Sequence, residues 1–161
     1  MTNIVKNTPE KRTIPILDDA DRKLISYLQE DGRMSFVKLA ALMGVTEGTI
    51  RRKYKKLVKD GALKITAISN PYAIGFDAPA FIGINVERRL LENVAEKLAQ
   101  MPEVQFVAVT TGIYEIIIQV ISYSNKNLYD LIMKIGGLEG IQNTHTFLML
   151  NIYKHSWKFI S

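Results

Sequence analysis

Apolar residues recur at helical spacing in three consecutive segments near the start of the chain. The pattern predicts helices over residues 17–31, 35–43 and 46–59, in each of which the apolar side chains form one inward face. Asp18 and Thr46 stand where the first and third helices need an N-cap. Three short helices of this kind are the minimum that can enclose a small core.

The third predicted helix is strongly basic on the sides that do not face this core. Ile50, Tyr54 and Leu57 share its apolar face. Its other positions carry one anion and six cations: Glu47, Arg51, Arg52, Lys53, Lys55, Lys56 and Lys59. A charge run alone is often only a solvated face. A short helix, a glycine turn and a basic helix, however, is the layout of a helix-turn-helix, whose second helix enters the DNA major groove.

The segment after the third helix alternates apolar and polar residues. Residues 63–69 are therefore predicted to form a strand, as a short wing or tether of the helical domain. Asn70-Pro71, followed by further Gly and Pro residues, marks a linker. We expect a flexible arm over residues 1–16, a DNA-binding domain over residues 17–69 and a linker over residues 70–79.

The second half of the chain predicts four strands and two helices. The strands are expected over residues 80–86, 104–111, 114–122 and 141–153, and the helices over residues 89–100 and 125–135. A tight turn at Gly112-Ile113 joins the second and third strands. This order is that of a ferredoxin-like fold, with four antiparallel strands and two helices on one face. The fold class is α+β: a three-helix, winged-helix-like helix-turn-helix domain followed by a ferredoxin-like domain over residues 80–161.

Two of these strands are apolar on both faces. In residues 114–122 apolar residues occupy both alternating sets of positions, and in residues 141–153 Phe147, Met149 and Tyr153 oppose a second apolar set. A sheet with one face in water normally alternates apolar and polar residues. Because two helices cover only one face, the other face is expected to pack against another subunit.

Composition agrees with nucleic-acid binding and argues against other classes. The formal net charge of +5 favours polyanionic partners. The chain has no cysteine, and His145 and His155 do not stand at a metal-ligand spacing, so we expect no metal site. No apolar run approaches the ~20 residues of a membrane span, and no secretory signal opens the chain. Neither a phosphate-binding loop nor a nucleophile elbow is present, so we expect no catalytic residues and no cofactor.

Three segments, in this order, resemble the Lrp/AsnC (leucine-responsive) family of transcription regulators. They are LDDADRKLISYLQEDGR from Leu17, LAALMGVTEGTIRRKYKKLVKDGAL from Leu39, and VAVTTGIYEIIIQV from Val107, which is similar to the family's Thr-Gly-x-x-Asp hairpin. The resemblance implies that the first half binds double-stranded DNA and that the second half binds a small effector, usually an amino acid. It also implies dimers formed through the sheets, commonly assembled into octamers, and a cytoplasmic, nucleoid-associated protein.

Candidate residues for two sites follow from the helix-turn-helix layout and the resemblance. Base edges are expected to meet the start of the third helix, at Glu47, Gly48, Thr49, Arg51 and Arg52. Phosphates are expected to meet Lys53, Lys55, Lys56 and Ser35. The family pattern places the effector at Gly112, Tyr114, Glu115, Thr144 and Thr146.

The hairpin departs from the family pattern at two positions. Glu115 stands where the family usually has Asp, and Ile113 where a polar residue is frequent. The acidic group is kept but reaches one methylene further, which leaves the identity of the effector open and is compatible with a ligand other than leucine or glutamine.

Two other functions fit parts of the sequence. A DNA-organising protein that coats DNA without sequence preference or effector would suit the positive charge and the expected assembly. A metabolic enzyme or regulatory subunit built on the ferredoxin-like half would require a catalytic constellation that the sequence does not display.

Overall fold

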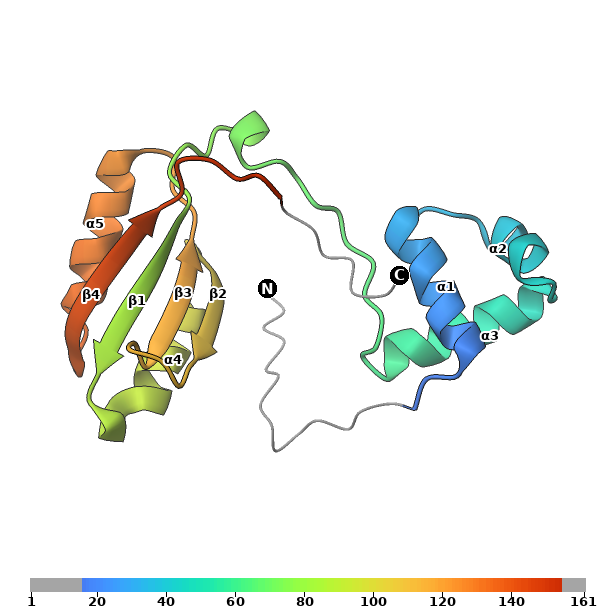
Figure 1. Cartoon of the computed structure of the whole chain (residues 1–161), viewed down its shortest axis with the longest axis horizontal. Helices are drawn as coiled ribbons and strands as arrows, with labels where there is room; N and C mark the ends of the chain where they lie inside the picture. Colours follow the sequence, from blue (N-terminus) through green and yellow to red (C-terminus); the bar gives the residue numbers. More distant parts are fainter. Residues whose placement is uncertain (1–15, 155–161) are drawn as a thin grey trace. The chain divides into compact units, whose positions relative to one another are not determined.

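The computed structural model describes residues 16–154, which divide into two compact units between Ile68 and Ser69. The first unit is helical and the second contains the sheet (Figure 1). Apart from Ile16, the predicted arm over residues 1–16 lies outside the described residues, as do residues 155–161 of the predicted second domain.

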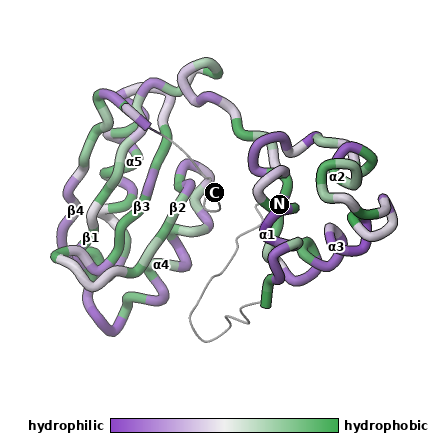
Figure 2. Tube along the Cα trace, turned by 45° about the vertical axis from the view of Figure 1, so that its right-hand side comes forward, coloured by the Kyte–Doolittle hydropathy of each residue, from purple (hydrophilic) through white to green (hydrophobic). Residues whose placement is uncertain are grey.

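The first unit contains the three helices that the apolar spacing predicted. They are α1 (Asp19–Glu30), α2 (Phe36–Met43) and α3 (Glu47–Lys59). Hydrophobic and hydrophilic residues alternate along these helices (Figure 2), and the hydrophobic ones meet in a core made of Leu24, Ile25, Leu28, Leu39, Ala40, Ile50 and Leu57. Gly44 takes the left-handed conformation (φ 67°) that turns the chain from α2 into α3. The helix-turn-helix prediction is therefore confirmed at the level of the fold.

The predicted wing is not formed. Residues 63–69 belong to no strand, although the apolar Leu63, Ile65 and Ala67 occupy alternate positions. Directly after α3, the amides of Ala62 and Leu63 both donate to the carbonyl of Leu57, which holds the start of this segment against the end of the helix. A strand needs a neighbour for its backbone groups, and this segment pairs with no other strand in the described part of the chain. Alternation alone therefore gave a wrong prediction.

The second unit is a four-stranded antiparallel sheet with two helices on one face (Figure 1). Its elements are β1 (Ala80–Val86), α4 (Leu91–Ala99), β2 (Val104–Val109), β3 (Ile116–Val120), α5 (Asn125–Gly136) and β4 (Ile141–Leu148), with short 3₁₀ turns at Tyr72–Ile74 and Arg88–Leu90. The strand order is β2-β3-β1-β4, and every neighbouring pair is antiparallel. This is the predicted ferredoxin-like arrangement.

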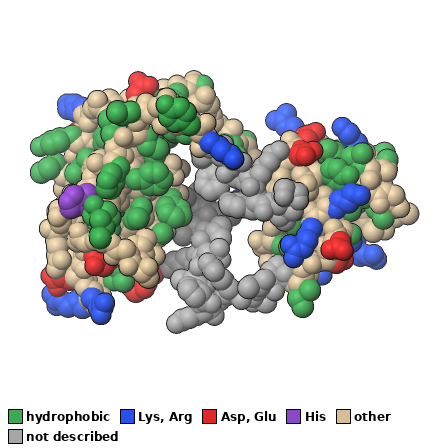
Figure 3. Space-filling view, viewed as in Figure 1, with side chains coloured by type: hydrophobic (Ala, Val, Ile, Leu, Met, Phe, Trp, Pro, Cys, Tyr) green, Lys and Arg blue, Asp and Glu red, His purple; other side chains and the backbone are tan. Residues whose placement is uncertain are grey.

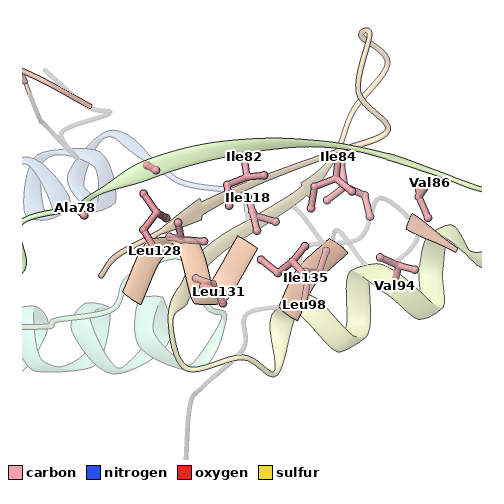
Figure 4. Close-up of a cluster of buried hydrophobic side chains, with 13 residues drawn as sticks. Ala78, Ile82, Ile84, Val86, Val94, Leu98, Ile118, Leu128, Leu131 and Ile135 are labelled. Carbon is pink, nitrogen blue, oxygen red and sulfur yellow. The ribbon is translucent and has the colours of Figure 1, made fainter. Parts of the chain in front are cut away.

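The core of this unit lies between the sheet and its two helices (Figure 4). Alternate residues of the central strands, such as Ile82, Ile84 and Ile118, are fully buried there. Val94 and Leu98 of α4 face them, together with residues of α5. The period-two pattern of the strands and the helical pattern of α4 and α5 thus meet in one apolar layer.

Three strands are shorter than predicted: β2 ends at Val109 rather than 111, and the start of β1 limits the ends of β3 and β4. β1 begins at Ala80, which pairs with Val120 on one side and Leu148 on the other. Beyond these pairs β3 and β4 have no partner residue on β1, so β3 ends at Val120 rather than 122 and β4 at Leu148 rather than 153. The predicted opposition of Met149 and Tyr153 to a second apolar set within one strand was therefore wrong.

The connection between β2 and β3 is a loop over residues 110–115 rather than a tight turn at Gly112-Ile113. The amide of Thr110 donates to the carbonyl of Glu115 (2.9 Å), which closes the loop. Tyr114 packs its ring onto β1 at Gly83, where an added Cβ would lie 2.4 Å from the ring. A glycine inside a strand often marks such a close approach.

The face of the sheet that carries no helix, called the open face here, is partly apolar. Phe81, Phe106 and Phe147 lie on it with 39%, 48% and 53% of their surface exposed. Tyr114 packs beside Phe147, with the ring centroids 6.1 Å apart. Hydrophobic side chains gather over these strands in the space-filling view (Figure 3).

Candidate DNA-binding and effector-binding sites

Helix α3 turns its apolar side to the core and its cations to the surface. Ile50 and Leu57 are buried and Tyr54 is half-buried, as their spacing predicted. The cations predicted for DNA that are exposed on the other sides are Arg51, Arg52, Lys55 and Lys56. The helix is therefore held by one face while most of its positive charge remains in solvent.

Arg51 is the cation of α3 with the most defined orientation among these four. Its Nη2 donates to Glu47 Oε1 at 2.6 Å, one helical turn earlier. Its guanidinium carbon lies 5.2 Å from the centre of the Phe36 ring, within the range of a cation–π contact. Phe36 in turn packs against Tyr54 on the inward side of α3. Sequence reasoning missed Phe36, although its position at the start of α2 was visible.

Of the small residues predicted for DNA, Ser35 is a helix cap, and Thr49 is bonded to Thr46, the cap of α3. Thr46 Oγ1 accepts from the amide of Thr49 and lies 3.0 Å from the Thr49 hydroxyl. Ser35 caps α2 by accepting from the amide of Lys38. Gly48 is exposed, and an added Cβ there would meet only Thr46 Oγ1, at 3.9 Å. These residues lie at the helix starts, where a backbone amide can meet a phosphate.

Lys53, which the sequence predicts to meet phosphates, is not free to do so. Its ammonium donates to Asp18 Oδ2 (2.7 Å) and to Asp21 Oδ1 (2.9 Å) at the start of α1. Only 21% of the Lys53 side chain is exposed, and 3% of that of Asp21. Because two carboxylates already hold the ammonium, Lys53 is withdrawn from the proposed phosphate contacts.

The loop over residues 110–115 is braced by Glu115. Glu115 Oε2 accepts from Asn85 Nδ2 (3.1 Å) and from the amide of Val86 (3.2 Å), both at the end of β1. These hydrogen bonds hold the pKa of the carboxyl below its ordinary value of 4.5, and the bond from Asn85 has the largest effect. Asn85 also donates to the carbonyl of Ile113. Asn85 was missed from the sequence, where the signal was one polar side chain in an apolar strand.

Gly112 lies exposed in this loop, and the described residues give no steric reason for a glycine there. Its φ is not positive, and an added Cβ would meet no atom within 4 Å. Within the chain itself, alanine would therefore fit at this position.

Thr144 and Thr146 do not lie with the loop residues. They stand opposite Ile84 and Ile82 in the pairing of β4 with β1, and directly opposed residues point to the same face. Both threonines therefore face the helix side of the sheet, whereas Tyr114 packs against His145 on the open face. The two threonines share a face, as predicted, but one copy of the chain does not bring them together with Tyr114.

A cavity lies at the other end of the sheet. It measures about 480 Å³ and is lined by residues of the turn before β2, the end of β3 and α5, with the stacked rings of Phe76 and Tyr123 at its edge. None of the predicted effector residues lines it.

Residues 16–154 offer neither a metal site nor a membrane-spanning helix. No group of three or more His, Asp or Glu side chains is placed to hold a metal ion there. No helix in the same residues is long and apolar enough to cross a membrane.

Both halves of the chain match known domain families. Residues 17–58 match the AsnC-type helix-turn-helix domain, and residues 79–158 match the Lrp/AsnC ligand binding domain. Fold and site together define a DNA-binding regulator with a separate ligand-binding domain. The chain belongs to the Lrp/AsnC family of transcriptional regulators.

Individual relatives agree with this assignment. An HTH-type transcriptional regulator of Pyrococcus furiosus is 37% identical over 141 residues, which cover 86% of this chain and 95% of the relative. The regulator FL11 of the same organism is 35% identical over 142 residues, covering 88% and 94%.

Two solved structures show the same fold. Escherichia coli AsnC superimposes with a TM-score of 0.80 at 30% identity, covering 88% of this chain and 97% of that one. A transcriptional regulator of Neisseria meningitidis in complex with L-Met gives 0.82 at 23% identity, covering 88% and 95%.

Proposed function

We propose that α3 reads operator DNA through Arg51 and Arg52 and holds phosphates through Lys55 and Lys56. The exposed cationic side of a helix fixed to its core by Ile50 supports this most directly. An arginine that meets guanine through two hydrogen bonds is worth about 1–3 kcal/mol of discrimination, whereas phosphate contacts fix register.

Footprinting on a native promoter tests this assignment. Arg51→Ala and Arg52→Ala should each lose operator protection while the fold is kept, because neither side chain lies on the buried face of α3. Lys126→Ala removes one exposed cation from the second unit instead and serves as the matched control. If both arginine variants protect the operator as the parent chain does, α3 is not the helix that enters the major groove.

We further propose an amino acid effector at the loop over residues 110–115. The chain's ligand-binding domain and the L-Met complex of the Neisseria regulator support this ligand class. Gly112 supports this location. Because glycine has no side chain, a ligand could approach the backbone of the loop closely there, and the chain itself does not need a glycine at this position, since an added Cβ would meet no atom within 4 Å. Glu115 is proposed mainly as the brace of this loop.

Thr144 and Thr146 enter this site only if a second copy of the chain supplies them. They lie on the opposite face of the sheet from Tyr114, so a pocket that contains both sets needs two subunits. We therefore propose a site between subunits. The apolar open face, with its three exposed phenylalanines, supports association of at least two copies.

Thermal-shift screening of the free amino acids, followed by calorimetry, tests the effector proposal. A true effector stabilises the fold by about 2.7 kcal/mol at a hundredfold excess over its Kd. Gly112→Ala should weaken its binding roughly tenfold or more without changing the thermal midpoint. Gly136→Ala, also placed where an added Cβ meets nothing, should leave binding unchanged. If Gly112→Ala binds as tightly as the parent chain, the pocket lies elsewhere.

We also propose that the protein acts in the cytoplasm on the nucleoid, without catalytic activity and without a cofactor. Its relatives are named transcriptional regulators, and double-stranded DNA is the partner that the helix-turn-helix domain fits.

A further inference from the structure

Lys53 differs from the other cations of α3 in what surrounds it. It follows Ile50 by three residues and precedes Leu57 by four, so it lies beside the buried face of the helix. Its two partners, Asp18 and Asp21, belong to the start of α1. The recognition helix thus carries one ammonium that points back into its own domain.

The acidic partners form a preorganised receptor for this ammonium. Asp18 caps α1 by accepting from the amide of Asp21, and Asp21 accepts in return from the amide of Asp18. This reciprocal capping box fixes both carboxylates to the first turn of α1. Asp21 is almost fully buried, and a buried carboxylate needs a counter-charge. Lys53 supplies it.

We propose that Lys53 is a positioning residue, which sets the seat of α3 on α1 and supports DNA binding without touching DNA. Only one register of α3 places residue 53 at the capping box, and in that register Arg51, Arg52 and Lys55 remain exposed. Breaking a buried ion pair by removing one partner leaves an uncompensated charge. Loss of Lys53 should therefore loosen the helix that presents the DNA-binding side chains. This inference rests on the proposed DNA contact of α3.

Salt dependence separates a positioning lysine from a phosphate-binding one. Each neutralised phosphate contributes about −0.9 to the slope of log Kobs against log[salt] on duplex DNA. Removing a phosphate contact should reduce the slope by about that amount, whereas moving the whole helix weakens binding without removing one defined contact. The full-length chain should be measured on a mixed-sequence duplex, beside its thermal midpoint.

Lys53→Met should lower the thermal midpoint by about 10 °C and weaken DNA binding while the salt slope stays unchanged. The matched control Lys55→Met, on the exposed side of the same helix, should reduce the slope by about 0.9 and keep the midpoint. In the double variant Asp21→Asn/Lys53→Met the unpaired buried charge is gone, so midpoint and affinity should return toward those of the parent chain. If Lys53→Met fails to fold, the salt slope and the thermal midpoint are measured on the double variant instead.

A slope reduced by about 0.9 in Lys53→Met, or in the double variant, would overturn the positioning role and return Lys53 to the phosphate contacts. An unchanged midpoint in Lys53→Met would overturn it as well. An unchanged slope in Lys55→Met would instead contradict the proposed DNA face of α3, so the two failures are distinguishable.

Discussion

At the scale of single residues, Glu47 shows how the neighbours of a DNA-binding side chain define its role. The sequence predicts that Glu47 itself meets base edges, but its carboxylate is bound to Arg51, whose guanidinium lies over Phe36. A guanidinium has five N–H donors in a planar fork, so Arg51 keeps donors for a base while two neighbours restrict its rotation. Glu47 therefore orients Arg51 and also reduces its attraction to phosphates.

Glu47→Gln should raise affinity for non-specific DNA and lower the preference for operator DNA. The loss of preference should be smaller than that of Arg51→Ala, whose base contact is worth about 1–3 kcal/mol. Fluorescence anisotropy on operator and shuffled duplexes at one salt concentration measures both effects. Glu30→Gln, which removes an exposed carboxylate from α1, is the control. Equal affinities for Glu47→Gln and Glu30→Gln on both duplexes would contradict the orienting role.

Residue roles could be predicted from the sequence when their partners were close along the chain. The caps Asp18 and Thr46 act on amides three residues away, and Ile50 is recognised by its helical spacing. The partners of Lys53 lie 32 and 35 residues earlier, so its sequence neighbourhood showed only another cation in a basic helix.

At the scale of elements, the contact between the 110–115 loop and β1 depends on Gly83. Gly83→Ala would push a Cβ into the Tyr114 ring, and overpacking of this kind costs about 1–3 kcal/mol. Urea unfolding should show that loss of free energy, and a smaller loss when the same change is made in a Tyr114→Ala background. Equal stability of Gly83→Ala and the parent chain would contradict the packing of Tyr114 on β1.

The ion pairs of Lys53 on α3 with Asp18 and Asp21 at the start of α1 predict that the stability of the fold depends on pH. The ammonium of Lys53 donates to Asp18 and lowers the pKa of that carboxyl below its ordinary value of 3.8. A carboxyl whose pKa is lower in the folded state stabilises the fold above its unfolded value, and this contribution is lost as pH falls through the folded value. Lys53, whose pKa is raised above 10.5, stays protonated throughout this range.

Thermal midpoints of the parent chain and of Asp18→Asn, compared between pH 6 and pH 2, test this dependence. Asparagine also caps helices, so the variant removes the charge and keeps the cap. The parent chain should be more stable above about pH 4, and the difference should shrink in stronger acid. A difference that is the same at every pH would contradict the ion pair.

Element ends could be predicted only where local residues determine them. β1 was predicted at its true bounds, but the ends of β3 and β4 depend on which of their residues pair with Ala80 at the start of β1, and no local pattern shows this pairing. Likewise, the sequence showed that Thr144 and Thr146 lie on the same face of the sheet. It did not show which face the 110–115 loop covers, because this depends on the path of the loop.

At the scale of the whole molecule, the open face of the sheet predicts association through its phenylalanines. Phe147→Asp places a charge opposite Phe81 on that face and should lower the molecular mass seen in sedimentation equilibrium. Val37→Asp alters an exposed apolar residue of the first unit and should not. A parent chain that sediments as a monomer would contradict the inference from the open face.

We expect this regulator to recognise a particular sequence in DNA rather than to coat DNA without sequence preference. The most direct test compares two affinities at one physiological salt concentration. One is the affinity for the fragment that the protein selects most strongly from genomic DNA, and the other is the affinity for a shuffled duplex of the same length. Specific recognition predicts a ratio of roughly 10³ or more. A ratio near one would contradict the claim and favour a protein that organises DNA without reading it.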